Sequence, residues 1–236
     1  MEAGPPLALH PMPENHSIDE GKSLKLYKKA PAPWKLKGQG IIMVYRFSKK
    51  WIEEHAGLPL HLQGKYKGGL GYVMLVNYEE SPVGPYKELL LIPGKFKGSG
   101  KQSITKIYVD SESSTQNGRA NWGIPKETAK IHWNEEGNTT LIRVQSKELE
   151  LFSCEVKSFG FRFPASTGIL PIDLHQRWDG VDYFTKPRGS GKAKLAKVNV
   201  KQVHHDFFPD ISLQRPLFVV KIEPFQIFFP KPTFHE

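Results

Sequence analysis

The feature that most constrains the fold of this chain is a series of short runs rich in β-branched and aromatic residues, separated by turn residues. Such runs are typical of β-strands, because these side chains suit a pleated, half-buried surface. Many short strands spaced by turns predict a mainly β protein, either a sandwich or a closed barrel. The runs span residues 40–47, 69–78, 86–92, 103–110, 128–134, 139–145, 148–154, 158–163, 181–184, 192–204 and 217–229.

Turn and helix signals complete this pattern. Glu135-Glu136-Gly137-Asn138 lies between two β runs and predicts a hairpin. Ser48 is a typical helix N-cap, so we expect a short helix over 49–56 that stops at Gly57. A second short helix is expected over roughly 113–121, although Gly118 weakens it.

The chain of 236 residues is long enough for one large β domain with a substantial core. Residues 1–20 contain four prolines and little periodicity, which predicts a flexible N-terminal arm or an oligomer contact, with a single domain over 21–236. Residues 207–234 hold seven of the 14 phenylalanines. This enrichment suits core packing plus an edge strand, and it also suits a subunit interface in a homo-oligomer.

The charge distribution bears on partners and location. With 33 Lys and Arg against 24 Asp and Glu, the net charge is +9, and residues 22–50 hold nine basic residues and no acidic one. No motif that reads nucleic acid accompanies this charge, so we expect a solvated face and no nucleic-acid partner. No apolar run approaches the length of a membrane span and no signal peptide is apparent, so we expect no membrane partner and a cytoplasmic location.

Several classes of catalytic site are not supported by the residues. A single cysteine, Cys154, excludes an intramolecular disulfide and a cysteine-based zinc site. His204 and His205 are adjacent, so on a strand they point to opposite faces and cannot easily share a metal ion. No Gly-x-Ser-x-Gly elbow and no complete P-loop occur. We therefore expect neither a metal nor a cofactor.

One lysine stands out. Lys126 directly follows Gly123-Ile124-Pro125, with Trp122 just before. A lysine held by a rigid proline in apolar company is a candidate for an activated amine, although exposed lysines also follow prolines. By itself, this pattern is weak evidence for a catalytic lysine.

The surrounding motifs resemble those of the acetoacetate decarboxylase family. Gly118-Arg119, followed shortly by Gly123-Ile124-Pro125-Lys126, is similar to the family's Gly-Arg-Glu…Pro-Lys-Lys signature, whose first lysine forms a Schiff base. Upstream, Pro85-Tyr86-Lys87-Glu88-Leu89 is similar to its Tyr-x-Glu segment, and Val44-Tyr45-Arg46 also recurs there. The resemblance covers most of residues 40–130. It implies a cone-shaped, largely antiparallel closed β-barrel with a few short helices, a buried pocket and a homo-oligomeric assembly.

The resemblance also implies roles for individual residues. Lys126 would form the imine and Glu88 would position the substrate or move a proton. Arg119, Tyr86 and Trp122 would bind substrate or support the lysine loop. The family is known to activate its lysine by desolvation or a neighbouring cation.

Two positions depart from the family pattern. Glu127 stands where the classical decarboxylases have a second lysine, and Gly38 stands where they carry a pocket arginine. If the backbone is extended, the Glu127 side chain diverges from that of Lys126. Because Gly38 has no side chain, Lys35 or Lys37 is a candidate to replace the missing arginine. Both departures put acetoacetate itself in doubt as the substrate.

The first functional hypothesis is therefore a Schiff-base lyase acting on a β-keto acid or related carbonyl compound, with decarboxylation as the expected reaction. An imine-dependent aldolase or dehydratase is the nearest alternative, because the same imine supports both. The rival of another class is a non-catalytic barrel that binds an apolar or anionic small molecule.

Overall fold

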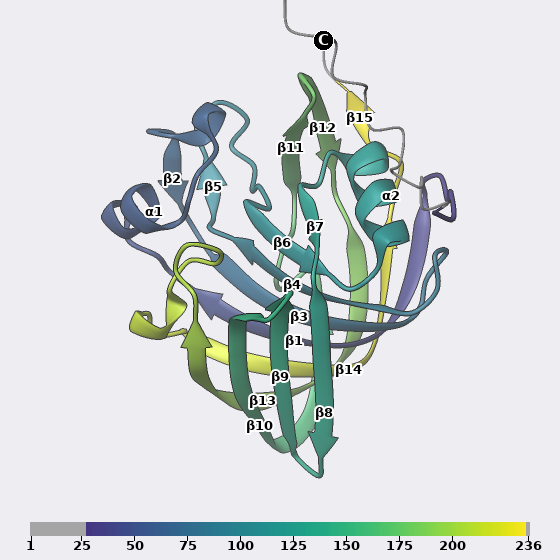
Figure 1. Ribbon diagram of the computed structural model, residues 1–236, viewed down its shortest axis with the longest axis vertical. Helices are drawn as coiled ribbons and strands as arrows, with labels where there is room; N and C mark the ends of the chain where they lie inside the picture. Colours follow the sequence, from purple (N-terminus) through teal and green to yellow (C-terminus); the bar gives the residue numbers. More distant parts are fainter. Residues whose placement is uncertain (1–26, 235–236) are drawn as a thin grey trace, which may run out of the picture.

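The computed structural model describes residues 27–234, which form one strongly curved sheet with two smaller ones (Figure 1). The strand order of the large sheet is β7-β6-β4-β3-β1-β14-β13-β10-β9-β8. Every pairing in it is antiparallel except that of β6 with β7. The strands are β1 (Trp34–Tyr45), β2 (Tyr66–Gly68), β3 (Gly71–Glu80), β4 (Tyr86–Ile92), β5 (Lys95–Phe96), β6 (Lys106–Val109), β7 (Lys126–Thr128), β8 (Lys130–Glu136), β9 (Thr139–Ser146), β10 (Leu149–Ser166), β11 (Leu174–Trp178), β12 (Val181–Thr185), β13 (Arg188–Val203), β14 (Phe218–Phe229) and β15 (Thr233–Phe234).

The large sheet is nearly closed into a barrel, which confirms the fold implied by the family resemblance and decides against the sandwich that the strand pattern also allowed. Its two edge strands, β7 and β8, follow one another in the chain. Across the barrel, the Glu135 carboxylate on β8 accepts a hydrogen bond from Gln39 Nε2 of β1 at 3.2 Å and one from Lys221 Nζ of β14 at 2.5 Å. These contacts tie an edge of the sheet to its middle.

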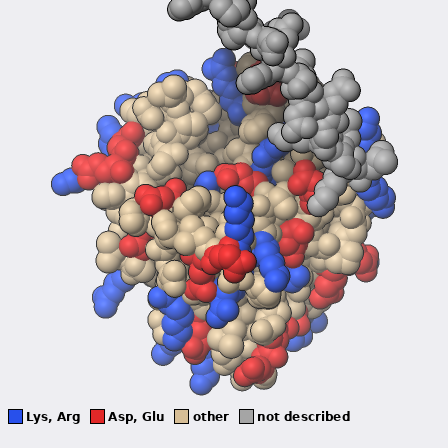
Figure 2. Space-filling model, in the orientation of Figure 1, with Lys and Arg blue, Asp and Glu red and all other residues tan. Residues whose placement is uncertain are grey.

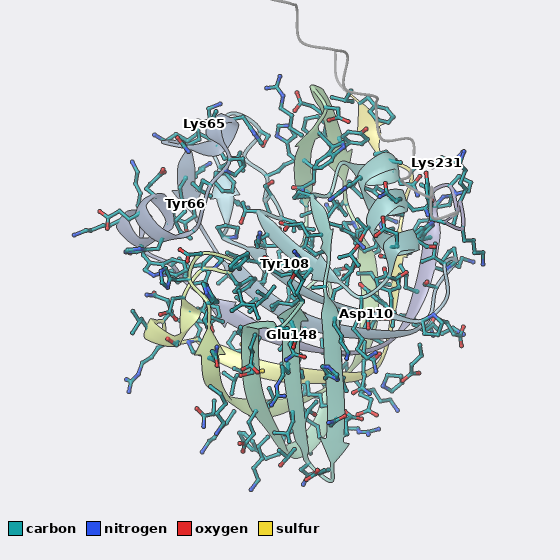
Figure 3. All side chains as sticks on the ribbon, in the orientation of Figure 1. Lys65, Tyr66, Tyr108, Asp110, Glu148 and Lys231 are labelled. Carbon is teal, nitrogen blue, oxygen red and sulfur yellow. The ribbon has the colours of Figure 1, made fainter. Side chains whose placement is uncertain are left out.

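The sheet separates two hydrophobic cores, and β1 contributes to both. Ile41, Met43 and Tyr45 lie in one core, whereas Val44 and the partly buried Ile42 belong to the other. Successive strand residues point to opposite faces, so a strand with cores on both sides needs consecutive apolar residues. Tyr108 of β6, labelled in Figure 3, lies in the first core near the centre of the molecule.

The helices match the sequence signals closely. The Ser48 side chain caps α1 (Lys49–His55) by accepting from Trp51 N at 3.2 Å, and Gly57 follows with a φ of 57°. Helix α2 (Glu112–Trp122) is capped by Ser111 and runs through Gly118 without interruption. Two single 3-10 turns, Leu60–Leu62 and Ile211–Leu213, complete the helical content of the described residues.

Some predicted boundaries are wrong. The runs 148–154 and 158–163 form one strand, β10, whose pairing with β13 is irregular between Phe159 and Phe163, where Gly160 has a φ of 76°. The glycine bends the strand without ending it. The run 128–134 is divided at Ala129 between β7 and β8. The hairpin at Glu135–Asn138 is confirmed, because it joins β8 to β9.

The C-terminal phenylalanines divide between core and surface. Phe208 is fully buried, and Phe225 and Phe229 pack against the second core. Phe218 and Phe234 are 40% and 57% exposed. A subunit interface at the exposed ones stays a prediction, and the expected N-terminal arm lies outside the described residues.

Basic and acidic side chains are interspersed over the face shown in Figure 2. Within the basic stretch, Lys35 and Lys37 are exposed on β1, and Lys37 Nζ lies 2.9 Å from Glu80 Oε2. Both signs of charge are therefore present where this part of the chain meets solvent.

Residues 27–234 contain no helix whose length and apolar character would let it cross a lipid bilayer.

Candidate functional site

The site begins where α2 turns into β7. The helix ends at Gly123, which adopts a left-handed conformation with a φ of 62° and donates its N–H to Arg119 O at 2.9 Å. Glycine is favoured there because other residues are strained at positive φ. Three residues later, Lys126 opens β7 opposite Ile107 of β6. The turn thus returns the chain to the sheet with the lysine at its first position.

The extended backbone of β7 separates Lys126 from its neighbour. Lys126 is buried, whereas Glu127 is exposed and its carboxylate lies 2.7 Å from Lys106 Nζ. The two side chains diverge, as expected for extended backbone. Glu127 therefore does not line the site.

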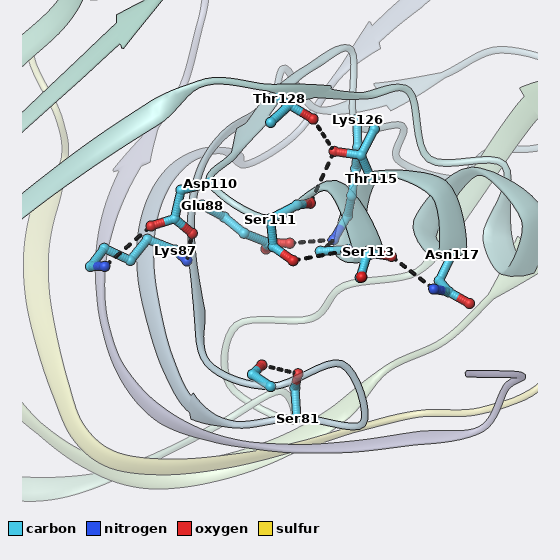
Figure 4. A network of polar contacts seen from close by, with 12 residues as sticks. Ser81, Lys87, Glu88, Asp110, Ser111, Ser113, Thr115, Asn117, Lys126 and Thr128 are labelled. Atoms are coloured by element: carbon cyan, nitrogen blue, oxygen red, sulfur yellow. Dashed lines mark hydrogen bonds and ion pairs between the residues drawn. The ribbon is translucent and has the colours of Figure 1, made fainter. Parts of the chain in front are cut away.

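Lys126 and Glu88 form a buried ion pair. Nζ of Lys126 donates to Glu88 Oε1 at 2.5 Å (Figure 4), and each residue is 4% exposed. A second hydrogen bond runs from the same amine to Ser114 Oγ on α2 at 2.9 Å. Three elements, β4, α2 and β7, thus converge on one amine. Because each charge is out of water, the pair must stay together or exchange its proton.

Two tyrosines flank the pair. Lys126 Nζ lies 5.0 Å from the centroid of the Tyr86 ring, and the rings of Tyr86 and Tyr78 are 4.8 Å apart. Burial, together with the nearby Glu88 carboxylate, raises the pKa of both phenols well above the usual range. Both hydroxyls therefore remain protonated at neutral pH and can donate hydrogen bonds.

The pair opens onto an apolar cavity of about 130 Å³. Its walls come mainly from aliphatic and aromatic side chains of the second core. Examples are Trp34, Ile42, Met74, Trp122 and Phe225. An apolar cavity with a few convergent polar groups is the usual form of a small-molecule site.

The other two predicted residues lie on α2 and occupy different places. Trp122 lines the cavity; its ring packs edge-on against Trp34 at 5.1 Å and its Nε1 donates to Pro230 O at 2.7 Å. Arg119 does not line the cavity, and its guanidinium lies 5.1 Å from the Trp178 ring on β11. Its backbone carbonyl accepts from Gly123, so it contacts the turn before Lys126 rather than the amine.

The position of the expected pocket arginine is closed to any side chain. A Cβ at Gly38 would lie 2.1 Å from Asn77 O on β3. The idea that Lys35 or Lys37 replaces the arginine is wrong, because both side chains face solvent on the opposite side of β1 from Leu36, a cavity residue. The sheet geometry therefore leaves this part of the wall uncharged.

Sequence reasoning missed three residues of the site. Ser114 is fully buried against Lys126, and its only signal is its place one turn after the Ser111 N-cap. Tyr78 pairs directly with Tyr86 across the β3–β4 hairpin, a register that two adjacent strand runs could have suggested. Trp34 lies upstream of the first predicted strand, which in fact begins at that residue.

Comparisons with known proteins agree with this architecture. The family model for acetoacetate decarboxylase matches residues 22–167. The structure of acetoacetate decarboxylase from Legionella pneumophila subsp. pneumophila str. Philadelphia 1 is similar with a TM-score of 0.67 and 16% identity, over 91% of this chain and 93% of that one. No curated protein sequence matches the chain.

Two further solved structures have the same fold. An acetoacetate decarboxylase-like enzyme from Sphingomonas wittichii RW1 is similar with a TM-score of 0.62 and 14% identity, over 88% of this chain and 94% of that one. The enduracididine biosynthesis enzyme MppR, solved with pyruvate, gives a TM-score of 0.58 and 14% identity, over 91% of this chain and 93% of that one. These likenesses confirm the predicted fold.

Proposed function

Because the chain belongs to the acetoacetate decarboxylase family, we propose that it is a lyase in which Lys126 forms a Schiff base with a β-keto acid or related carbonyl compound. Decarboxylation is the proposed reaction. The observation that carries the proposal is the buried contact of Lys126 Nζ with Glu88 Oε1 at 2.5 Å, at the wall of an apolar cavity.

The pair offers a way to make the amine nucleophilic. An ordinary lysine is less than about 0.1% neutral at pH 7, and only the neutral amine attacks a carbonyl carbon. Transfer of one proton from Nζ to Oε1 leaves a neutral amine and a neutral acid, a form that burial favours over separated charges. Glu88 thus acts as the first general base.

The same carboxyl group then serves imine formation. The amine attacks the carbonyl carbon, the oxygen takes the proton from Glu88, and a second proton passes from nitrogen through Glu88 to the leaving hydroxyl. One water departs, leaving a protonated imine beside the Glu88 carboxylate. Two of the three amine protons leave in the water and the third stays on nitrogen, so the net charge of the site is unchanged.

The protonated imine is the electron acceptor for the carbon–carbon cleavage. The electron pair of the bond to the carboxylate moves toward the imine nitrogen, giving carbon dioxide and an enamine. One proton from solvent converts the enamine carbon back to an imine, and water hydrolyses that imine to the ketone and free Lys126. Glu88 and Ser114, which both contact the Lys126 amine, and the Tyr86 hydroxyl, which lies against these two side chains, are the polar groups that can relay this proton.

An aldolase or dehydratase is the second candidate. MppR, which shares the fold with a TM-score of 0.54 in this complex, was solved with the condensation product of pyruvate and imidazole 4-carboxaldehyde. In that chemistry the enamine attacks a second carbonyl carbon in place of a proton. The same lysine and carboxylate would serve both reactions.

Borohydride trapping tests the proposal. Wild-type protein is incubated with β-keto and α-keto acids, reduced, and examined by intact mass and peptide mapping. We expect a reduced adduct on Lys126 that disappears in Lys126→Met and persists in Lys130→Met, a change at an exposed lysine of β8. A folded protein that traps no carbonyl compound, or traps it elsewhere, would contradict the proposal and favour a ligand-binding barrel.

Turnover of the trapped substrate separates the roles. Glu88→Gln keeps the shape of the side chain and removes the proton acceptor. We expect the rate of carbon dioxide release to fall by about 10²–10⁴-fold. If a condensation product forms in place of carbon dioxide when an aldehyde is added, the aldolase reading replaces decarboxylation.

A further inference from the structure

The cavity wall carries information about the part of the substrate that does not react. Among the described residues that line the cavity, Lys126 and Glu88 are the only ones with charged side chains, and they pair with each other. Once the imine forms, the Glu88 carboxylate still neutralises the charge on its nitrogen. No further cation on this wall is then available to bind a second carboxylate.

Apart from Tyr78, Tyr86, Ser166, Thr167, Ser190 and Gln226, the remaining side chains of the wall are apolar, and solvent reaches part of this apolar surface. Ile42, Ile172, Phe225, Ile227 and Phe229 line the cavity, yet each keeps some exposure to solvent. Removing such surface from water is favourable in proportion to its area. A substrate whose apolar group covers this surface would therefore bind more tightly than a short keto acid, which leaves the surface exposed to water.

The volume limits the size of that group. The cavity of about 130 Å³ is slightly smaller than the engineered apolar cavity of about 150 Å³ that accepts benzene. There is room for a ring or for a chain of about four to six carbons next to the reacting carbonyl.

From these observations, and resting on the proposed Schiff-base function, we propose that the substrate is a monocarboxylic keto acid carrying an apolar alkyl or aryl group of about four to six carbons. The apolar group lies along the wall formed by β1 and β14, and binding there holds the carbonyl carbon at Lys126. Dicarboxylic keto acids are excluded by the missing cation. Binding of the remote group thus replaces the charge pairing that an arginine would give.

A series of keto acids tests this substrate class. Acetoacetate, 3-oxohexanoate, 3-oxooctanoate, benzoylacetate and oxaloacetate are compared by the concentration that gives half-maximal borohydride trapping at Lys126. Each buried methylene is worth about fourfold in affinity, so we expect 3-oxooctanoate to trap at a concentration at least tenfold lower than acetoacetate, and oxaloacetate to trap worst. Equal concentrations across the series, or a preference for oxaloacetate, would overturn the proposal.

Substitutions in the cavity wall test where the apolar group of the substrate binds. Ile42→Phe on β1 and Ile222→Phe on β14 each fill part of the cavity from neighbouring strands, so either one serves if the other fails to fold. We expect both to reduce the advantage of 3-oxooctanoate over acetoacetate at least threefold. Ile169→Phe is the matched control, because Ile169 is 69% exposed and does not line the cavity. A chain-length preference unchanged in both wall variants would also overturn the proposal.

Probes without a carbonyl distinguish the two proposals. Hexan-1-ol, benzyl alcohol and ethanol are tested for their effect on the thermal unfolding of wild-type protein and Ile42→Phe. If adducts form at Lys126 but the concentration for half-maximal trapping does not depend on chain length, the Schiff-base function is supported and the proposed substrate class is refuted. Stabilisation by hexanol and benzyl alcohol that Ile42→Phe weakens, with no adduct from any carbonyl, supports an apolar ligand and refutes the Schiff base. If the protein shows neither adduct formation nor stabilisation by the alcohols, both proposals are refuted.

Discussion

The side chain of Lys126 passes directly over Gly118 of α2. A Cβ at Gly118 would lie 2.6 Å from Cδ and 2.8 Å from Cε of the lysine, closer than such atoms approach in proteins. The lysine therefore reaches Glu88 and Ser114 across a gap that a glycine leaves in the helix surface. This relationship explains why a residue unfavourable for helices lies inside α2.

Gly118→Ala should consequently separate folding from function. The added methyl favours the helix by up to about 1 kcal/mol, but it forces the lysine stem away from its two hydrogen-bond partners. We expect a free energy of unfolding within about 2 kcal/mol of wild type and a rate of borohydride trapping reduced at least tenfold. Ala120→Ser, on the exposed side of α2, is the control and should trap like wild type. Unchanged trapping in Gly118→Ala would show that the amine does not need this path.

Ser114→Ala removes the second hydrogen bond of the Lys126 amine. A hydrogen bond to a charged group contributes about 1.5–3 kcal/mol, so we expect trapping at Lys126 to slow by about tenfold or more. The control is Ser113→Ala on the same helix, where the hydroxyl accepts only from Lys28 N among the described contacts. Equal trapping rates in the two variants would remove Ser114 from the site.

The buried pair should also be coupled in stability. Lys126→Met leaves the Glu88 carboxyl group buried without its partner, and Glu88→Gln leaves the Lys126 amine buried without a carboxylate. Removing one member of such a pair costs about 3–5 kcal/mol of folding stability. The double variant should cost less than the sum, with a coupling above about 1 kcal/mol in urea unfolding. Lys37→Met with Glu80→Gln is the comparison, because that pair is 52% and 66% exposed.

The exposed comparison pair should show a coupling of about 0–1 kcal/mol. A buried pair no more coupled than this exposed one would mean that Lys126 and Glu88 do not depend on each other in the folded protein.

The strand pattern of the sequence predicts the fold well because both faces of the central strands are buried. The run Ile41–Val44 is apolar at every position, and the structure places a core on each side of it. Predictions failed where pairing continues through a turn-like residue. Gly160 bends β10 without ending it, since the partner strand β13 is long enough to pair on both sides.

The site was only partly predictable. Residue spacing singles out Lys126, and the family resemblance adds Glu88, which is 38 residues away in the sequence. Their direct contact depends on the parallel pairing of β6 with β7, which no local pattern encodes. Ser114 was missed because its signal is that of a helix terminus. The uncharged wall at Gly38 follows from the closeness of β3, a tertiary property.

The single cysteine, Cys154, is a free thiol buried in the first core. Burial raises the pKa of the Cys154 thiol to about 12, from about 9 for an exposed thiol. Between these values the folded protein keeps the proton and the unfolded chain loses it. The unfolded state then binds fewer protons, so this contribution to stability is complete below pH 9 and is lost as pH rises toward 12, by up to about 1.4 kcal/mol per pH unit.

Urea unfolding of wild type and Cys154→Ala at pH 8, 9, 10 and 11 measures this effect. Other groups titrate in both proteins, so the informative quantity is the difference between their free energies of unfolding. We expect wild type to be more stable than Cys154→Ala at pH 8, because the buried thiol fills space in the core. This difference in free energy of unfolding should decrease steadily above pH 9. Ser153→Ala, next to it on β10, should show a difference from wild type that does not change with pH. A constant difference for Cys154→Ala up to pH 11 would mean that the thiol ionises without unfolding.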